Sequence, residues 1–189
     1  RGDISLSYSN SQPGYTLAPL NVEGSSKSLT TALIYPYKRS RKENLFFETG
    51  LTVRNTSTEF LDQEFLDDKL RILYLKADYD RYNGWGGSNT YTGTISKGVN
   101  ILDSTNTGIG NPSRIEGRSD FYKMTAQATH SQDFLKIFKL FTSASGQYSA
   151  HPLLSSEEFG YGGMEFGRAY DPSEITGDRG LSYSAELQY

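Results

Sequence analysis

The residues best suited to a specific chemical role lie in one glycine-rich stretch, FGYGGMEFGRAYDPSEITGDRG, which runs from Phe159 to Gly180. Arg168 and Tyr170 stand near its centre among six glycines, which favour a tightly folded backbone over an open surface tip. A loop of this length without predicted secondary structure is usually functional. The guanidinium of Arg168 offers a planar fork of donors that suits a carboxylate, and a partly buried guanidinium without such a partner is costly. An acidic partner for Arg168 is therefore expected.

The candidate partner is Glu186, in the segment that follows this loop. Strict alternation from Leu181 to Tyr189 places the larger apolar side chains on one face and the polar ones on the other. Glu186 falls on the polar face together with Ser182, Ser184 and Gln188. From the residues alone, two readings stay open: an Arg168–Glu186 pair across the loop, or two unrelated surface charges.

Other chemistry-bearing patterns are weak. The chain has no cysteine and two histidines far apart, so no metal site is expected. Two pairs of carboxylates are adjacent in sequence, Asp67–Asp68 and Glu157–Glu158. Neighbouring residues of an extended chain point to opposite faces, so neither pair is suited to act as a catalytic dyad, and we interpret both as solvated loop charges. No phosphate-binding glycine motif is found, so we expect no cofactor and no enzyme. A formal net charge of −3 gives no electrostatic reason to expect a nucleic-acid partner.

The chain that carries these residues is built of segments with a period of two, and helical periodicity is scarce. Eight such segments are predicted: Ile4–Tyr8, Ser26–Tyr35, Asn44–Asn55, Lys69–Asp80, Asn89–Gly98, Asp120–His130, Leu135–Ser149 and Leu181–Tyr189. They average about ten residues, longer than the five or six that are usual in soluble sheets. A tilted strand of about 9–11 residues crosses a bilayer.

The two faces of these segments differ in the way that a membrane barrel requires. One face carries Leu, Tyr and Phe diluted by Ala, Gly and Thr, and the other is hydroxylated or charged. Aromatic residues make up 13% of a chain whose mean hydropathy is −0.57. Aromatic residues at strand ends and a polar interior are typical of outer-membrane barrels. The fold class predicted is therefore all-β, an antiparallel transmembrane β-barrel; the alternative is a soluble all-β domain.

The connections between the segments alternate between long and short. The long ones are Ser9–Ser25, Thr56–Asp68, Val99–Ser119 and Ala150–Arg179, and the short ones are Pro36–Glu43, Arg81–Ser88 and Ser131–Phe134. Outer-membrane barrels have long loops outside the cell and tight turns on the periplasmic side. We therefore expect the 150–179 loop to be exterior in topology and folded inward. Trp85, in a short turn, is predicted to anchor at a membrane interface.

Several stretches resemble a known family. PLLSSEEFGYGGMEFGRAYDPSEITGDRGLSYSAEL, LSYSNSQPGYTLAPLNVEG, YPYKRSRKENL and YNGWGGSN are similar to the barrel of two-partner secretion transporters. These are the haemolysin and filamentous-haemagglutinin secretion/activation proteins of the outer-membrane assembly superfamily. The resemblance implies a sixteen-stranded barrel preceded by POTRA domains. Residues 1–189 would then be the central part of the barrel, about eight strands, without the POTRA domains and the remaining strands.

The resemblance also assigns site residues. The family carries Arg-Gly-Tyr or Arg-Gly-Phe at the tip of a loop tucked into the pore, and this motif falls on Gly167, Arg168, Ala169 and Tyr170, with Ala169 in place of the usual glycine. The segment Gly177, Asp178, Arg179 and Gly180 opens the next strand, as it does in the family. The family's loop arginine pairs with an acidic residue on the inner wall, which falls on Glu186.

The function implied is that of a bacterial outer-membrane pore that passes an unfolded partner from the periplasm to the cell surface. The partners implied are a large secreted β-helical exoprotein and outer-membrane lipid. Two alternatives stay open: an insertase of the same superfamily that serves barrel clients, and a plain porin or adhesin barrel.

Overall fold

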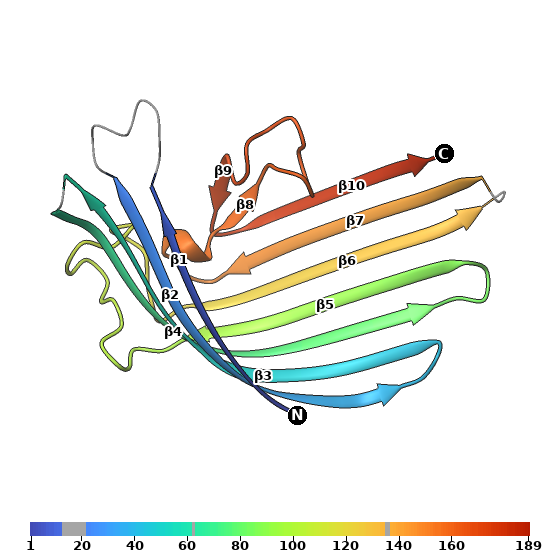
Figure 1. The fold of residues 1–189 in the computed structure, drawn as a ribbon, viewed down its shortest axis with the longest axis horizontal. Helices are drawn as coiled ribbons and strands as arrows, with labels where there is room; N and C mark the ends of the chain where they lie inside the picture. Colours follow the sequence, from blue (N-terminus) through green and yellow to red (C-terminus); the bar gives the residue numbers. More distant parts are fainter. Residues whose placement is uncertain (13–21, 62, 135–136) are drawn as a thin grey trace.

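An eight-stranded antiparallel sheet forms most of the chain in the computed structural model, which describes residues 1–12, 22–61, 63–134 and 137–189. Its eight strands lie in the order β1-β2-β3-β4-β5-β6-β7-β10, so that β1 and β10 are the edges of a strongly curved sheet (Figure 1). The strands are β1 (Gly2–Ser11), β2 (Glu23–Arg39), β3 (Glu43–Phe60), β4 (Gln63–Tyr82), β5 (Gly87–Gly98), β6 (Tyr122–Phe134), β7 (Phe138–Ser149) and β10 (Gly180–Gln188). Over those described ranges, the chain contains no helix of the length and apolarity needed to cross a membrane.

All eight predicted segments are strands, which confirms the period-two analysis, but three of them are much longer than predicted. β2, β3 and β4 have 17, 18 and 20 residues. The predicted long connection Thr56–Asp68 is wrong, because β3 continues to Phe60 and β4 begins at Gln63. In this part of the sheet most side chains are hydroxylated or charged, and the apolar ones come in adjacent pairs, Phe60–Leu61 and Phe65–Leu66, so the alternation that marks a strand is missing. Hydroxyl pairs across the strands, such as Ser25 Oγ to Ser57 Oγ at 2.9 Å, accompany the pairing instead.

Two other predicted boundaries fall partly outside the described residues. The first long connection is shorter than predicted, since β1 reaches Ser11 and β2 begins at Glu23, and residues 13–21 within it are not described. The prediction that a strand begins at Leu135 lies outside the described residues; β7 is described from Phe138.

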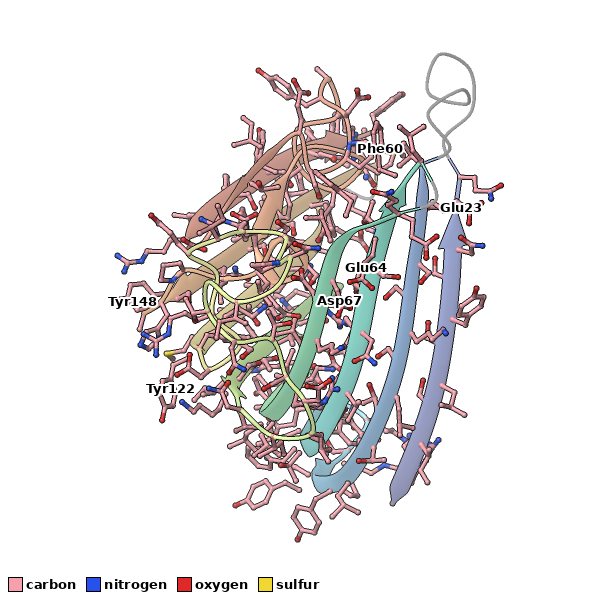
Figure 2. All side chains as sticks on the ribbon, turned by 90° about the vertical axis from the view of Figure 1, so that its left-hand side faces the viewer. Glu23, Phe60, Glu64, Asp67, Tyr122 and Tyr148 are labelled. Carbon is pink, nitrogen blue, oxygen red and sulfur yellow. The ribbon has the colours of Figure 1, made fainter. Side chains whose placement is uncertain are left out.

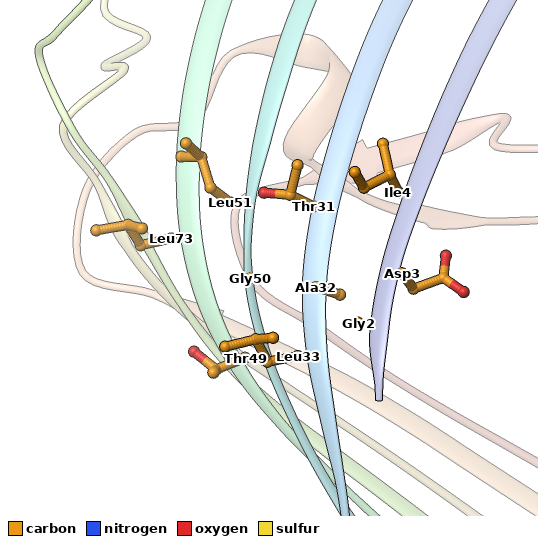
Figure 3. A pocket seen from close by; sticks show the side chains of 10 residues that line it. All are labelled: Gly2, Asp3, Ile4, Thr31, Ala32, Leu33, Thr49, Gly50, Leu51 and Leu73. Atoms are coloured by element: carbon orange, nitrogen blue, oxygen red, sulfur yellow. The ribbon is translucent and has the colours of Figure 1, made fainter.

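The outer face of the sheet is apolar and uncovered over most of its area. It carries exposed side chains from every strand, among them Ile4, Leu33, Leu73, Tyr91, Met124, Tyr148 and Leu181. In Figure 3, Ile4, Leu33 and Leu73 lie around a shallow groove that crosses β1 to β4 near the small residues Ala32 and Gly50. In a water-soluble protein an exposed apolar face of this extent would be a liability, whereas lipid tails cover it at no cost.

The inner face is the polar one, and it carries Arg54, Lys123, Gln127, Gln147 and Glu186 among others. At one end of the sheet, the connections 99–121 and 150–158 are joined to each other and to this face. The Arg118 N–H donates to the Pro152 carbonyl at 3.0 Å. Beneath them lies a small apolar cluster, the only sizeable buried core in the described chain: Leu70, Ile72, Phe121, Leu153 and Leu154.

The connection between β7 and β10 has secondary structure of its own, contrary to the prediction of an unstructured loop. A 3₁₀ turn at Ser155–Glu157 is followed by a short hairpin of β8 (Phe159–Tyr161) and β9 (Ile175–Gly177). The hairpin acts as a stem, and residues 162–174 form the tip that it carries. The candidate site is built on this tip.

Candidate functional site

Arg168 and Glu186 are in contact. An Arg168 Nη2 donates to Glu186 Oε1 as an ion pair, and the Arg168 Nε donates to the Met164 carbonyl at 3.2 Å. Glu186 lies six residues into β10 from Gly180, which is about 20 Å along a strand at roughly 3.3 Å per residue. The loop tip therefore reaches well down the inner face instead of standing above the end of the sheet.

The tip is a tight backbone turn in which glycine is required at one position. Gly167 has a φ of 74°, and a Cβ built there would lie 2.7 Å from the ring of Tyr161. Its carbonyl accepts from the Tyr170 N–H at 2.9 Å, so the turn holds Arg168 and Ala169 between the two. Ala169 is not among the non-glycine residues with positive φ, so the replacement of the family's usual glycine introduces no backbone strain. The residue of the motif that needs glycine geometry is Gly167.

A second wall contact orients the tip. The Gln127 Nε2, on β6, donates to Glu165 Oε1 at 2.5 Å. Tyr170 packs against Tyr161 of the stem, with ring centroids 6.1 Å apart. Polar contacts to β6 and β10 and an aromatic contact to its own stem thus fix the tip on the inner face.

The root of the loop, the part next to the sheet that contains Glu157, Glu158 and Asp178, is held by Glu157. The interpretation of Glu157 as a solvated charge is wrong. Its side chain is 8% exposed and accepts from Arg54 Nη1 at 2.8 Å and from Lys123 Nζ at 2.5 Å. Arg54 is on β3 and Lys123 on β6, three strands apart, or about 14 Å across a flat sheet at roughly 4.8 Å per strand. One carboxylate reaches both because it lies on the concave side of the curved sheet. The 150–179 connection is therefore folded toward the inside of the curve.

Asp178 and Glu158 complete this root through Arg114. The Arg114 Nη1 donates to Asp178 Oδ1 at 2.6 Å and lies 3.1 Å from Glu158 Oε1, so Glu158 is not a solvated charge either. The Leu153 N–H also donates to Asp178 Oδ1, at 2.8 Å. Burial by itself would raise the pKa of Asp178, but the hydrogen bonds from Arg114 and Leu153 outweigh it and hold that pKa below its ordinary value. Of the other residues of this motif, Gly177 ends β9 and Gly180 begins β10, one residue before the predicted start at Leu181.

The lowered pKa of Asp178 predicts a pH-dependent attachment of the loop root. A group with a lowered folded-state pKa stabilises the structure above its ordinary pKa, and the stabilisation is lost as the pH falls through the folded-state value. In the full-length protein, Asp178→Asn should increase the rate of pepsin cleavage in the 150–179 loop about ten-fold near pH 5, the equivalent of about 1.4 kcal/mol. The ratio of variant to wild-type rates should fall toward one as the pH drops below the lowered pKa of Asp178. A ratio that does not change with pH would contradict the assignment.

The root cations were not singled out from the sequence. Arg54 and Lys123 each look like ordinary polar-face residues of a strand, and Arg114 lies in a long connection. Their position in the strands was the one feature of the sequence that could have identified them. Arg54 and Lys123 lie on the polar face, near the same end of the sheet as Glu157. Adjacent acidic residues at the start of a long connection and cations on a facing wall are complementary, but only the curvature of the sheet brings them within reach of one another.

A curved antiparallel sheet with an apolar outer face, a polar inner face and a long connection docked inside defines a segment of an outer-membrane β-barrel wall. Comparison with known proteins gives the family. Residues 3–189 match the model of the haemolysin secretion/activation protein family ShlB/FhaC/HecB, and the chain belongs to this family. It is accordingly part of a bacterial outer-membrane transporter of the two-partner secretion type.

Individual relatives support this family assignment. The chain is 32% identical over 144 residues to the outer membrane transporter CdiB of Dickeya dadantii strain 3937, covering 74% of this chain and 25% of that protein. Among solved structures, CdiB from Escherichia coli superposes with a TM-score of 0.74 at 19% identity, covering 88% of this chain and 31% of the other. CdiB from Acinetobacter baumannii gives 0.74 at 18% identity, covering 98% and 34%. The chain thus spans between 25% and 34% of the length of these proteins.

Proposed function

We propose that the full-length protein is a pore that passes an unfolded exoprotein from the periplasm to the cell surface, and that the 150–179 loop is its internal working part. The observation that carries the proposal is the loop tip on the inner face, with Arg168 against Glu186. Family membership supports the transporter class. Residues 1–189 would supply the central strands of the barrel.

The inner face suits an extended polypeptide as cargo. Between the loop contacts it presents hydroxyls, amides and short charged side chains, such as Thr92, Thr125 and Ser145. These side chains can replace water as hydrogen-bond partners of the cargo's backbone N–H and C=O groups. Without a partner, burying each backbone group would cost several kcal/mol, on the order of 2–7. No bond of the cargo is made or broken. Folding of the exoprotein outside the cell would make the movement one-way.

The Arg168–Glu186 contact would fix the loop in the position from which transport proceeds. Arg168 is 61% exposed along its side chain and Glu186 is 27% exposed, so the pair remains accessible to water and can be exchanged for other partners. A latch that must open and close is better served by such a pair than by a fully buried one. Asp178 and the Glu157 contacts would keep the root attached while the tip moves.

The proposal is tested with a strain that lacks the gene and expresses a candidate exoprotein gene from the same genome. Returning the full-length protein should restore the exoprotein to the cell surface at least ten-fold over the empty vector, measured by antibody labelling of intact cells. The amounts of unrelated outer-membrane barrels should stay unchanged in the deletion strain. A general loss of those barrels would instead indicate an insertase. Small-solute conductance in planar bilayers with no effect on the exoprotein would indicate a plain porin.

A further inference from the structure

Two cations lie on aromatic rings at the outer face of the sheet, at the end that carries the long connections. The Lys97 Nζ is 3.6 Å from the ring centroid of Tyr122, and the Arg179 Cζ is 4.5 Å from that of Tyr148. Tyr122 and Tyr148 are on neighbouring strands, and the partner of Tyr148 in β6 is Met124, two residues from Tyr122. Such a diagonal pair has Cα atoms about 7–8 Å apart. Both rings are about half exposed, and both project outward from the sheet in Figure 2.

Neither cation is neutralised by the protein. Within the described ranges, no carboxylate lies within ion-pair distance of Lys97 or Arg179. The Arg179 Nε donates to the Ser149 carbonyl at 2.9 Å, which fixes the base of the guanidinium and leaves its terminal nitrogens free of described protein acceptors. The charge of Lys97 acts on Asp120 and that of Arg179 on Asp178, but Arg118 already donates to Asp120 at 2.8 and 2.7 Å and Arg114 to Asp178 at 2.6 Å. The patch therefore keeps a net positive charge.

The height of the patch corresponds to the outer membrane interface. Arg179 and Tyr189 bracket β10, ten residues apart, which is about 33 Å along a strand. A tilt of roughly 40° reduces this to about 25 Å, the height of the apolar band of an outer-membrane barrel. Leu181, Tyr183 and Leu187, all exposed on the outer face, lie between the two. With Tyr189 at one interface, Arg179 stands at the other, on the side of the long connections.

We propose that Lys97, Tyr122, Tyr148 and Arg179 form a binding site for the phosphate of a phosphorylated glycolipid in the outer leaflet, of the lipid A type. An arginine fork and an ammonium are the groups that bind phosphate oxygens best, and rings of tyrosine position them by cation–π contact. The same rings cover the sugar and the first carbons of the acyl chains, as interfacial aromatics do. A phosphate there supplies the negative charge that the protein does not. The site does not depend on the secretion function proposed above and would exist in any outer-membrane barrel with this surface.

The test uses the full-length protein in detergent micelles, titrated with purified bisphosphorylated lipid A and followed by native mass spectrometry. Lys97→Gln combined with Arg179→Gln should weaken lipid A binding at least ten-fold. Lys27→Gln is the matched control, because Lys27 lies over Tyr8 at 5.9 Å and no second cation–π pair adjoins it among the described residues, and it should change binding less than two-fold. Heat-dependent migration on a denaturing gel checks that each variant is folded.

Three outcomes would overturn the proposal. The first is equal lipid A binding by the double variant and the wild type. The second, which requires no variant, is equal binding of bisphosphorylated and fully dephosphorylated lipid A by the wild type. The third is full competition by inorganic phosphate at the concentration of the lipid, which would show an anion site with no lipid component. Retained binding by the wild type, loss with dephosphorylated lipid and loss in the double variant together support it.

Discussion

Replacing Arg168 with alanine should reduce exoprotein secretion by the full-length protein at least ten-fold while the barrel remains assembled. The variant removes the ion pair to Glu186 and the hydrogen bond to the Met164 carbonyl, which together attach the tip to its turn and to β10. The turn itself is kept, because Gly167 and Tyr170 still make their backbone bond. Secretion is measured as exoprotein in the medium and on intact cells, and assembly as heat-dependent gel migration of the barrel.

The partner residue provides the control. Glu186→Ala should cause a loss of the same size, and the Arg168→Ala, Glu186→Ala double variant should be no worse than either single one if the two act as a pair. Exchanging the charges, Arg168→Glu with Glu186→Arg, should restore part of the activity. Gln127→Ala, which removes the other wall contact of the tip, should have a smaller effect because it breaks one hydrogen bond of a neutral amide. Normal secretion by Arg168→Ala would refute the latch role.

The architecture was predictable because two simple signals agree along the chain. Period-two alternation located all eight strands, and the long connections favoured a membrane barrel, although the connection between β3 and β4 is short and not long as predicted. The same alternation placed Glu186 on the inner face, where the structure brings it to Arg168. These are local properties of the chain, because the alternation depends only on each strand having one face toward lipid and one toward the interior.

What could not be predicted depends on the curvature of the sheet and on polar strand ends. The extension of β3 to Phe60 and of β4 from Gln63 carries no apolar alternation, so the sequence reads as a loop there. Glu157 looked like a solvated charge because its partners Arg54 and Lys123 are far away in sequence and on separate strands. Only the curvature of the sheet brings them together, and the sequence contains no local signal for that distance.

The loop therefore has two attachments of different kinds. The tip is held by an accessible pair and one amide, whereas the root is held by a nearly buried carboxylate with two cations and a hydrogen bond from Gln147 to the Glu157 carbonyl. Buried pairs are costly to break because the remaining charge is left without a partner. This difference predicts that the tip can leave the inner face of the sheet while the root stays attached. It also predicts that different substitutions release the tip and the root independently.

Glu157→Gln should release the root, and this is the largest structural effect expected from one substitution in the chain. It leaves Arg54 and Lys123 facing a neutral amide, and breaking a buried ion pair costs about 3–5 kcal/mol, with the lower value appropriate here because Arg54 is 31% exposed. About 3 kcal/mol corresponds to roughly 100-fold faster amide hydrogen exchange in residues 153–161 of the full-length protein.

Glu64→Gln, at an exposed position of β4 that makes no ion pair in the described chain (Figure 2), should leave that exchange unchanged. Arg168→Ala should also leave it unchanged while secretion is lost. Equal exchange in wild type and Glu157→Gln would show that the root is held by its apolar contacts at Leu153 and Leu154 instead.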